Sequence, residues 1–220
     1  RLHDLYIDLA HLVYALNQHG EMLCADATTG REVWRKSLTK DFGGGVPGWG
    51  YSESPLIEGD KVLCTPGGQK GAVVALSRKT GSLAWQSREF TDGAHYSSLV
   101  PETILGQRQV VQLTAASVAG IAVADGRLLW QANRPGRTAV VPTPVYADNQ
   151  VFVSSGYGVG CNAFKISKAA DGFKAEQVYD NKNMVNHHGG IILLDGHLYG
   201  FSDGKGWVCK IAPANLDADL

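Results

Sequence analysis

Short apolar runs alternate with turn residues along almost the whole chain. The runs are four to six residues long, are rich in β-branched side chains, and are bounded by Gly, Pro, Asp and Ser. This pattern is typical of β-strands. No segment keeps apolar residues at the helical spacing of about 3.6 residues, so we expect almost no helix. The pattern therefore predicts an all-β chain.

One strand–turn–strand pattern recurs along the chain. Residues 54–63 show it, and residues 143–152 and 190–199 match it position for position. Their turns hold residue types that tolerate positive φ, as tight hairpins require. Residues 98–110 carry a longer version, and a degraded version ends at Leu16.

A second pattern ends in tryptophan. It covers residues 24–34, 75–85 and 120–130, with a glycine four residues before each tryptophan, and the tryptophans are 51 and 45 residues apart. Such a period is typical of repeated supersecondary units, and four-stranded units around an axis make a β-propeller. In the second repeat the four strands are expected near residues 55–57, 61–65, 72–76 and 82–86.

The two patterns predict one β-propeller domain over residues 1–220. It holds about four complete four-stranded blades and a partial fifth. We interpret the chain as a fragment of a larger ring of seven or eight blades, or as a ring whose last blade is atypical. The predicted blades cover residues 5–38, 54–87, 98–131, 143–180 and 190–220. Trp34, Trp85 and Trp130 are expected to be structural. A large ring on an outer strand fills the gap between sheets, and its N–H can reach a backbone carbonyl of the next blade.

Composition and charge narrow the function classes. The chain has 20 Lys and Arg against 21 Asp and Glu, with no long basic run, so a nucleic-acid partner is not expected. No apolar run approaches the roughly 18 residues of a transmembrane helix. The four cysteines form no CxxC pair, and we expect them to be small buried residues. They are Cys24, Cys64, Cys161 and Cys209.

The segments that lead into the first strand of each blade are rich in aromatic residues and histidine. In a propeller these segments open on one face, at the mouth of the central channel. Aligning the first strands places Tyr51, His95 and His187 at one position, and Ser52, Tyr96 and His188 at the next. A ligand pocket is therefore predicted there, for a planar ligand or a carbohydrate. Its residues are Trp49, Tyr51, Glu53, His95, Tyr96, His187 and His188.

A metal site is a further hypothesis for the same segments. Histidines ligate metals, and the candidates are His95, His187 and His188, with Glu53 as a carboxylate partner. His187 and His188 are adjacent, so in a strand they would point to opposite sides. The alternative is that all these residues are polar channel fillers that close turns. Spacing alone identifies no catalytic residue.

The tryptophan pattern, A-x-D-x-x-T-G-x-x-x-W, resembles the tryptophan-docking motif of the pyrroloquinoline quinone (PQQ)-like propeller repeats. This group includes quinoprotein dehydrogenases and the lipoprotein propeller of the outer-membrane assembly machinery. The fourth repeat departs from the motif, with Tyr179 roughly at the tryptophan position after an insertion. The first three repeats match at Asp26, Thr29, Gly30 and Trp34, at Ala75, Thr80, Gly81 and Trp85, and at Gly126 and Trp130.

The resemblance implies a binding or scaffold module for an unknown small molecule or protein. It implies a periplasmic or other extracytoplasmic location, although no signal peptide is seen in this chain. The alternative is a quinone-dependent alcohol or sugar dehydrogenase, with PQQ, calcium, a catalytic aspartate and often a vicinal cysteine pair. The chain has no such cysteine pair, and only Glu53, Asp92 and Asn186 stand at the channel entries as oxygen ligands.

Overall fold

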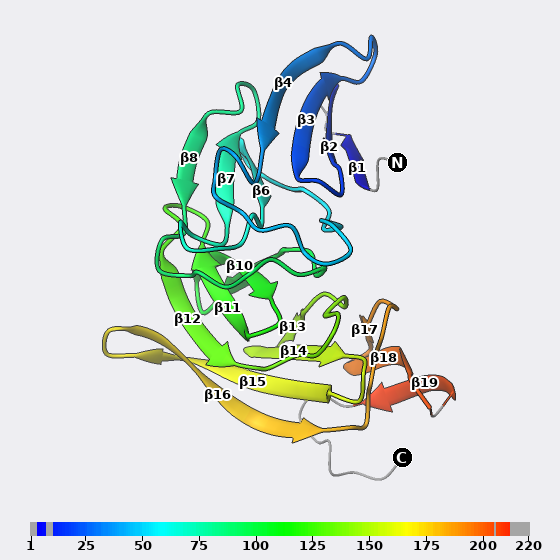
Figure 1. Ribbon diagram of the computed structural model, residues 1–220. Helices are drawn as coiled ribbons and strands as arrows, with labels where there is room; N and C mark the ends of the chain where they lie inside the picture. Colours follow the sequence, from blue (N-terminus) through cyan, green and yellow to red (C-terminus); the bar gives the residue numbers. More distant parts are fainter. Residues whose placement is uncertain (1–3, 8–10, 205, 212–220) are drawn as a thin grey trace.

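The computed structural model describes residues 4–7, 11–204 and 206–211. The part it describes is all-β, with five antiparallel sheets stacked side by side around an arc (Figure 1). Four sheets have four strands and the fifth has three, and each runs outward in chain order. The predicted partial propeller is confirmed.

The first two sheets come from residues 4–86. Each is a meander in which consecutive strands are hydrogen-bonded neighbours. Their strands are β1 (Asp4–Ile7), β2 (Leu12–Leu16), β3 (Glu21–Asp26), β4 (Glu32–Ser37), β5 (Leu56–Glu58), β6 (Lys61–Cys64), β7 (Val74–Ser77) and β8 (Leu83–Gln86).

The other three sheets repeat the meander, and the β15–β16 hairpin is the longest of the molecule (Figure 1). Their strands are β9 (Val100–Ile104), β10 (Gln107–Leu113), β11 (Ser117–Ala122), β12 (Leu128–Asn133), β13 (Val145–Ala147), β14 (Gln150–Ser155), β15 (Gly160–Ala169), β16 (Gly172–Asn181), β17 (Ile192–Leu194), β18 (His197–Ser202) and β19 (Gly206–Ile211).

The outer pair of strands carries the same irregularity in all four complete sheets. The register shifts in the third strand, directly after the residue that pairs with the large aromatic of the fourth strand. In the fourth sheet that aromatic is Tyr179, which pairs with Ala163. Tyr179 therefore takes the tryptophan position, as the repeat alignment predicted.

The first two tryptophans connect neighbouring sheets. The Trp34 Nε1–H donates to the Arg78 carbonyl at 2.8 Å, and the Trp85 Nε1–H donates to the Val123 carbonyl at 2.9 Å. Each ring also covers the turn glycine of the next sheet. A Cβ at Gly81 would lie 2.7 Å from Trp34 Cδ2. A glycine is therefore required there both by its positive φ and by the tryptophan above it.

Trp130 departs from this arrangement. Its Nε1–H donates to the buried Gln109 Oε1 of its own sheet at 2.7 Å, so the predicted bond to a backbone carbonyl of the next blade is wrong for this residue. The long β15–β16 hairpin carries its turn glycine, Gly172, away from any such contact. The Trp130 ring packs instead with Phe164 and Ile166 of β15.

The core lies between the sheets. Apolar clusters join each sheet to the next, as where Trp34 and Leu38 pack with Val62 and Val74. Burying this surface is the main term that holds the blades together, at about 25 cal/mol per Å². Cys24, Cys64 and Cys161 are fully buried, as the sequence predicted. Cys209 lies in β19, where side chains are outside the described part.

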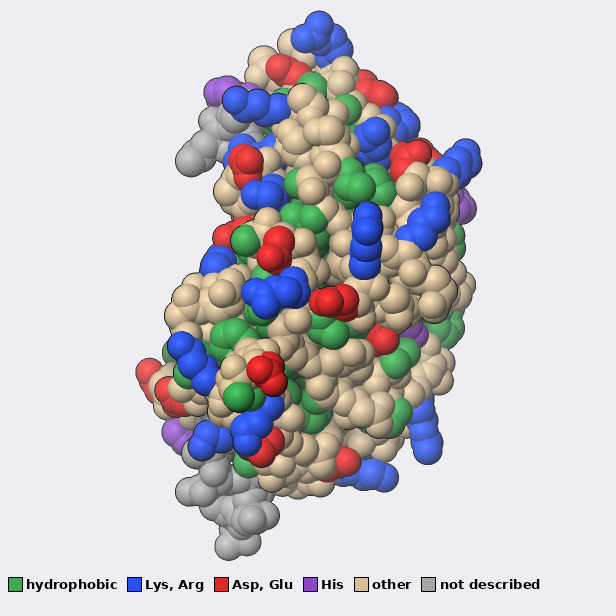
Figure 2. Space-filling model, turned by 90° about the vertical axis from the view of Figure 1, so that its left-hand side faces the viewer, with side chains coloured by type: hydrophobic (Ala, Val, Ile, Leu, Met, Phe, Trp, Pro, Cys, Tyr) green, Lys and Arg blue, Asp and Glu red, His purple; other side chains and the backbone are tan. Residues whose placement is uncertain are grey.

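The outer side of the arc carries Lys and Arg interspersed with Asp and Glu, with no large area of one sign on the face that Figure 2 shows. This surface offers no basic patch to a nucleic acid on that face. Within the ranges that the structure describes, no helix has the length and apolar character needed to span a bilayer.

Candidate functional site

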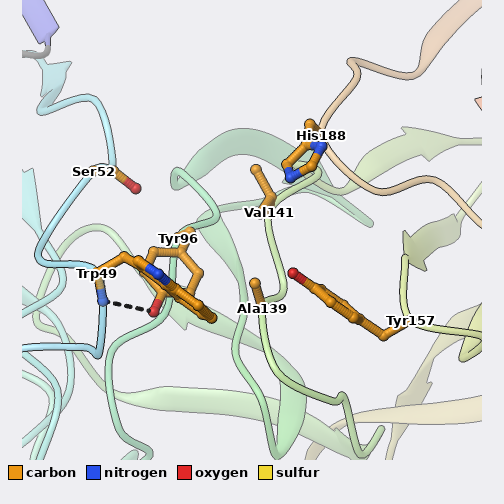
Figure 3. Close-up of a pocket in the computed structure, with 7 residues that line it drawn as sticks. All are labelled: Trp49, Ser52, Tyr96, Ala139, Val141, Tyr157 and His188. Atoms are coloured by element: carbon orange, nitrogen blue, oxygen red, sulfur yellow. Dashed lines mark hydrogen bonds between the residues drawn. The ribbon is translucent and has the colours of Figure 1, made fainter.

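A cavity of about 390 Å³ opens on the face where the outer strand of one sheet leads to the inner strand of the next. Four of these connecting segments contribute to it, together with the β14–β15 turn. Aromatic side chains stand on two sides of the cavity and small apolar ones lie between them (Figure 3). The lining residues are Trp49, Ser52, Tyr96, Ala139, Val141, Tyr157 and His188.

The first side of the cavity is built on Trp49. Its backbone N–H donates to the Tyr96 hydroxyl at 3.2 Å, and the two ring centroids lie 5.8 Å apart. Tyr96 is buried, and the His95 ring packs edge-on against it with the two ring centroids 4.8 Å apart. Trp49 itself is 65% exposed. Its backbone is therefore held by a hydrogen bond while its indole remains accessible at the cavity.

His95 supports this side rather than lining the cavity. Its Nδ1 accepts the Val140 N–H at 2.9 Å, which requires that this nitrogen carry no proton. Burial lowers the pKa of His95 below its ordinary value, because the charged imidazolium loses hydration. The residue therefore acts as a neutral hydrogen-bond acceptor that ties two connecting segments together.

The second side is built on three aromatic rings in mutual contact, those of Tyr157, His187 and His188. Tyr157 meets His187 edge-on at 4.2 Å, and His187 and His188 stack at 3.9 Å with 14° between their planes. The predicted opposite orientation of the two histidines is wrong, because they lie in an irregular loop and not in a strand. Asp203 holds the stack in place through a 3.0 Å contact from its Oδ2 to His187 Nδ1.

Sequence reasoning missed Tyr157. It lies in the β14–β15 turn with a φ of 57°, between Gly156 and Gly158. A bulky residue rarely takes this left-handed conformation, and such strain gathers at functional sites. Position 156 requires a glycine for a steric reason, because a Cβ there would lie 2.8 Å from His187 Cγ. An aromatic residue between glycines in a tight turn was the available signal.

Small apolar and polar side chains complete the cavity. Ala139 and Val141 lie between the two aromatic sides, the Tyr157 hydroxyl points inward toward Ala139, and Ser52 and His188 lie farther out (Figure 3). None of the seven lining residues is acidic, Lys or Arg. Ala139 and Val141 come from a segment with no polar signal, so the sequence could not select them.

Two of the predicted pocket residues turn inward. Tyr51 is buried, donates its hydroxyl to the Pro66 carbonyl at 2.8 Å, and has its pKa raised by burial. Glu53 is 2% exposed and accepts the Thr65 N–H. They connect the segment to the second sheet, while Trp49 and Ser52 of the same segment face the cavity.

The histidines are not arranged as a metal centre. Among the residues that the structure places, no three His, Cys, Asp or Glu side chains form a group that could hold a metal ion. The stacked rings of His187 and His188 lie in nearly parallel planes, so their nitrogens do not converge on one point. His95 belongs to the opposite side of the cavity.

The segment from Asn186 to His188 also holds buried polar atoms with unused hydrogen-bonding capacity. Asn186 is fully buried, and neither atom of its amide finds a partner in the described part of the chain. The same holds for His187 Nε2. Each such atom costs about 1–3 kcal/mol of folding stability, and functional sites are one place where this cost is tolerated.

The family described as "Outer membrane protein assembly factor BamB" matches residues 10–215, which is nearly the whole chain. The chain belongs to this family. It is therefore a member of the PQQ-like propellers, as the tryptophan repeats indicated. No curated protein sequence matches it.

Solved structures of the PQQ-like propellers have the same fold. BamB from Moraxella catarrhalis superposes with a TM-score of 0.67 at 16% identity, over 96% of this chain and 57% of that one. A quinohemoprotein alcohol dehydrogenase from Pseudomonas putida HK5 gives 0.60 at 15% identity, over 93% and 39%. The chain thus spans little more than half, or less, of these proteins, and the likeness shows the fold alone.

The cavity does not fit PQQ and calcium. The quinone is a polyanion, and calcium takes carboxylate and carbonyl oxygens as ligands. None of the seven lining side chains is a Lys or Arg that could pair with the quinone, and none is a carboxylate or amide that could hold calcium. The structure therefore supports no quinone-dependent step at this site.

Proposed function

We propose that this PQQ-like propeller is an extracytoplasmic binding module, and that its ligand occupies the cavity between Trp49 and Tyr157. The observation that carries the proposal is the open indole of Trp49. It is 65% exposed although its backbone is hydrogen-bonded and its ring contacts Tyr96. Large aromatic residues that stand open at a cavity are the usual anchors of binding energy.

The cavity has the character of a small-molecule site. Its volume of about 390 Å³ lies within the range of about 300–1,000 Å³ typical of ligand pockets, which are mostly apolar with a few placed polar groups. The supporting contacts fix both sides before any ligand arrives. Tyr96 and His95 hold one side, and Asp203 holds the other through His187. Such preorganisation lowers the entropy cost of binding.

A ligand-observed NMR screen of a small neutral fragment library tests the proposal. We expect several fragments to receive saturation transfer from the protein, and to lose it in Trp49→Ala. Phe201→Ala is the matched control, because Phe201 is a half-exposed aromatic residue on β18 that does not line the cavity. If Phe201→Ala lowered the signals as much as Trp49→Ala, the proposed site would be wrong.

The family description favours a second role, as a scaffold for protein assembly. Val46, 48% exposed, lies in the same loop as Trp49 and would contact a protein partner at that face. A photo-crosslinking amino acid at position 46, in cells that make the full-length protein, should capture a defined partner. The same amino acid at Leu83, which is also exposed but lies on the outer strand β8, is the control.

The dehydrogenase alternative is tested separately. Full-length protein is titrated with PQQ and calcium, and dye-linked oxidation of alcohols and sugars is followed. We expect no saturable change in the quinone absorbance and no oxidation. Stoichiometric quinone binding with dye reduction would overturn the proposal of a binding module.

A further inference from the structure

We propose that the ligand of this cavity is a neutral carbohydrate, with one pyranose ring between Trp49 and Tyr157 and a second ring on the far side of Trp49. This inference rests on the proposed binding function and names the class of ligand. It is carried by the aromatic sides, the absence of charge among the lining residues, the polar groups around the aromatic surface, and a second hollow that shares Trp49.

The aromatic sides suit the C–H faces of a sugar. Trp49 and Tyr157 stand across the cavity from each other, with Ala139 between them (Figure 3). A pyranose has flat faces of C–H bonds, which pack on the electron-rich faces of aromatic rings. The indole contacts Tyr96 in a tilted geometry, with 55° between the ring planes, and this leaves much of its surface for a ligand.

The lining residues favour an uncharged ligand. A buried charge without a counter-charge is costly, and none of the seven lining residues is Lys, Arg, Asp or Glu. An anionic sugar or a nucleotide would meet no cation here. A cationic amino sugar would meet no carboxylate.

Three polar groups lie around the aromatic surface, where they can meet the hydroxyls of a sugar. The Ser52 and Tyr157 hydroxyls can donate and accept, and His188 offers an imidazole (Figure 3). A purely aromatic ligand would leave these three groups unused. A sugar uses both the apolar faces and the polar groups.

Trp49 also borders a second hollow, of about 320 Å³. Gln18 and His19 line it and hydrogen-bond to each other at 3.2 Å through their Nε2 atoms. Because Trp49 lines both hollows, a ligand of two or more rings can reach both while it contacts this residue. We therefore expect a disaccharide to bind more tightly than its monosaccharide.

The test is a titration of the protein with defined neutral sugars. Glucose, galactose, N-acetylglucosamine, maltose and cellobiose are used as probes, with glucuronate and glucosamine as charged counterparts. Binding is followed by saturation-transfer NMR and calorimetry. We expect at least one neutral disaccharide to bind, with an affinity at least tenfold above both its monosaccharide and the charged sugars.

Variants locate the binding. Trp49→Ala should weaken the disaccharide at least tenfold, while Phe201→Ala leaves its affinity unchanged. Tyr157→Phe should weaken it about two- to tenfold, the effect of one lost hydrogen bond. Gln18→Ala should weaken the disaccharide but not the monosaccharide. Circular dichroism of each variant verifies that the fold is kept.

The outcomes distinguish a failure of the carbohydrate inference from a failure of the proposed binding function. If indole or other aromatic fragments bind through Trp49 while no sugar does, the carbohydrate inference is wrong and the binding function stands. If charged sugars bind as well as neutral ones, the inference from charge is wrong. If no probe binds in a Trp49-dependent way, the carbohydrate inference and the proposed function both fail.

Discussion

The contact between each tryptophan and the next turn glycine allows a sharp test of how the blades are joined. Gly30 and Gly81 hold equivalent turn positions in the first two sheets, with φ of 72° and 68°. A Cβ added at Gly30 would meet nothing within 4 Å, whereas at Gly81 it would lie 2.7 Å from Trp34 Cδ2. Gly30→Ala therefore measures the backbone strain alone, and Gly81→Ala adds the collision with the tryptophan.

The magnitudes follow from these contacts. An alanine in the left-handed region costs about 1–2 kcal/mol, and this cost applies to both variants. In Gly81→Ala the indole must also move by about 0.7 Å to restore an ordinary contact of 3.4 Å. Overpacking of this kind costs about 1–3 kcal/mol, and a weakened Trp34–Arg78 hydrogen bond adds about 1 kcal/mol. We expect Gly81→Ala to be less stable than Gly30→Ala by about 2–4 kcal/mol.

Urea denaturation followed by circular dichroism measures this difference, with the slopes compared because repeat proteins can lose two-state behaviour. In a Trp34→Ala background the extra penalty of Gly81→Ala should disappear, which isolates the coupling between the two residues. Equal stabilities of Gly30→Ala and Gly81→Ala, within about 0.5 kcal/mol, would refute the reasoning.

Three further predictions concern the interior. Arg134 is buried and donates to Asn162, Ser155 and the Gly160 carbonyl, so Arg134→Met should lower the free energy of unfolding by about 3–5 kcal/mol in urea melts. The Tyr179 hydroxyl is buried without a hydrogen-bond partner in the described part, so Tyr179→Phe should be neutral or stabilising by about 1 kcal/mol in the same assay. Because the folded-state pKa of His95 lies below 6.5, the unfolded chain binds more protons at acid pH. Its contribution to stability is therefore complete above about pH 6.5 and falls as the pH drops below that value, which thermal melts from pH 5 to 8 will show.

Each of these predictions has a control. Arg134→Lys keeps the charge but loses the planar fork, and should fall between wild type and Arg134→Met. Tyr179→Ala, which also removes the ring, should destabilise strongly where Tyr179→Phe does not. His95→Gln should flatten the stability profile below pH 6.5. An unchanged slope in His95→Gln would assign the acid sensitivity to other groups.

The candidate site was only partly predictable. Trp49, Tyr96 and His188 were expected at the cavity and line it. Tyr51 was expected to align with His95 and His187, but its hydroxyl bonds the Pro66 carbonyl and the ring is buried. The alignment gave equivalent positions along the chain. It could not give the direction of side chains in loops, where no strand alternation fixes them.

The sequence by itself determined the repeated architecture. The spacing of apolar runs, turn residues and tryptophans is local, because each sheet is a meander of consecutive strands. The tertiary structure alone decided which residues form the cavity. Trp49, Ala139 and Tyr157 come from three connections far apart in the chain, and Tyr157 takes its place through a strained turn and a glycine that admits His187. Such a site depends on how the blades are placed relative to one another, and the apolar clusters between neighbouring sheets fix that placement.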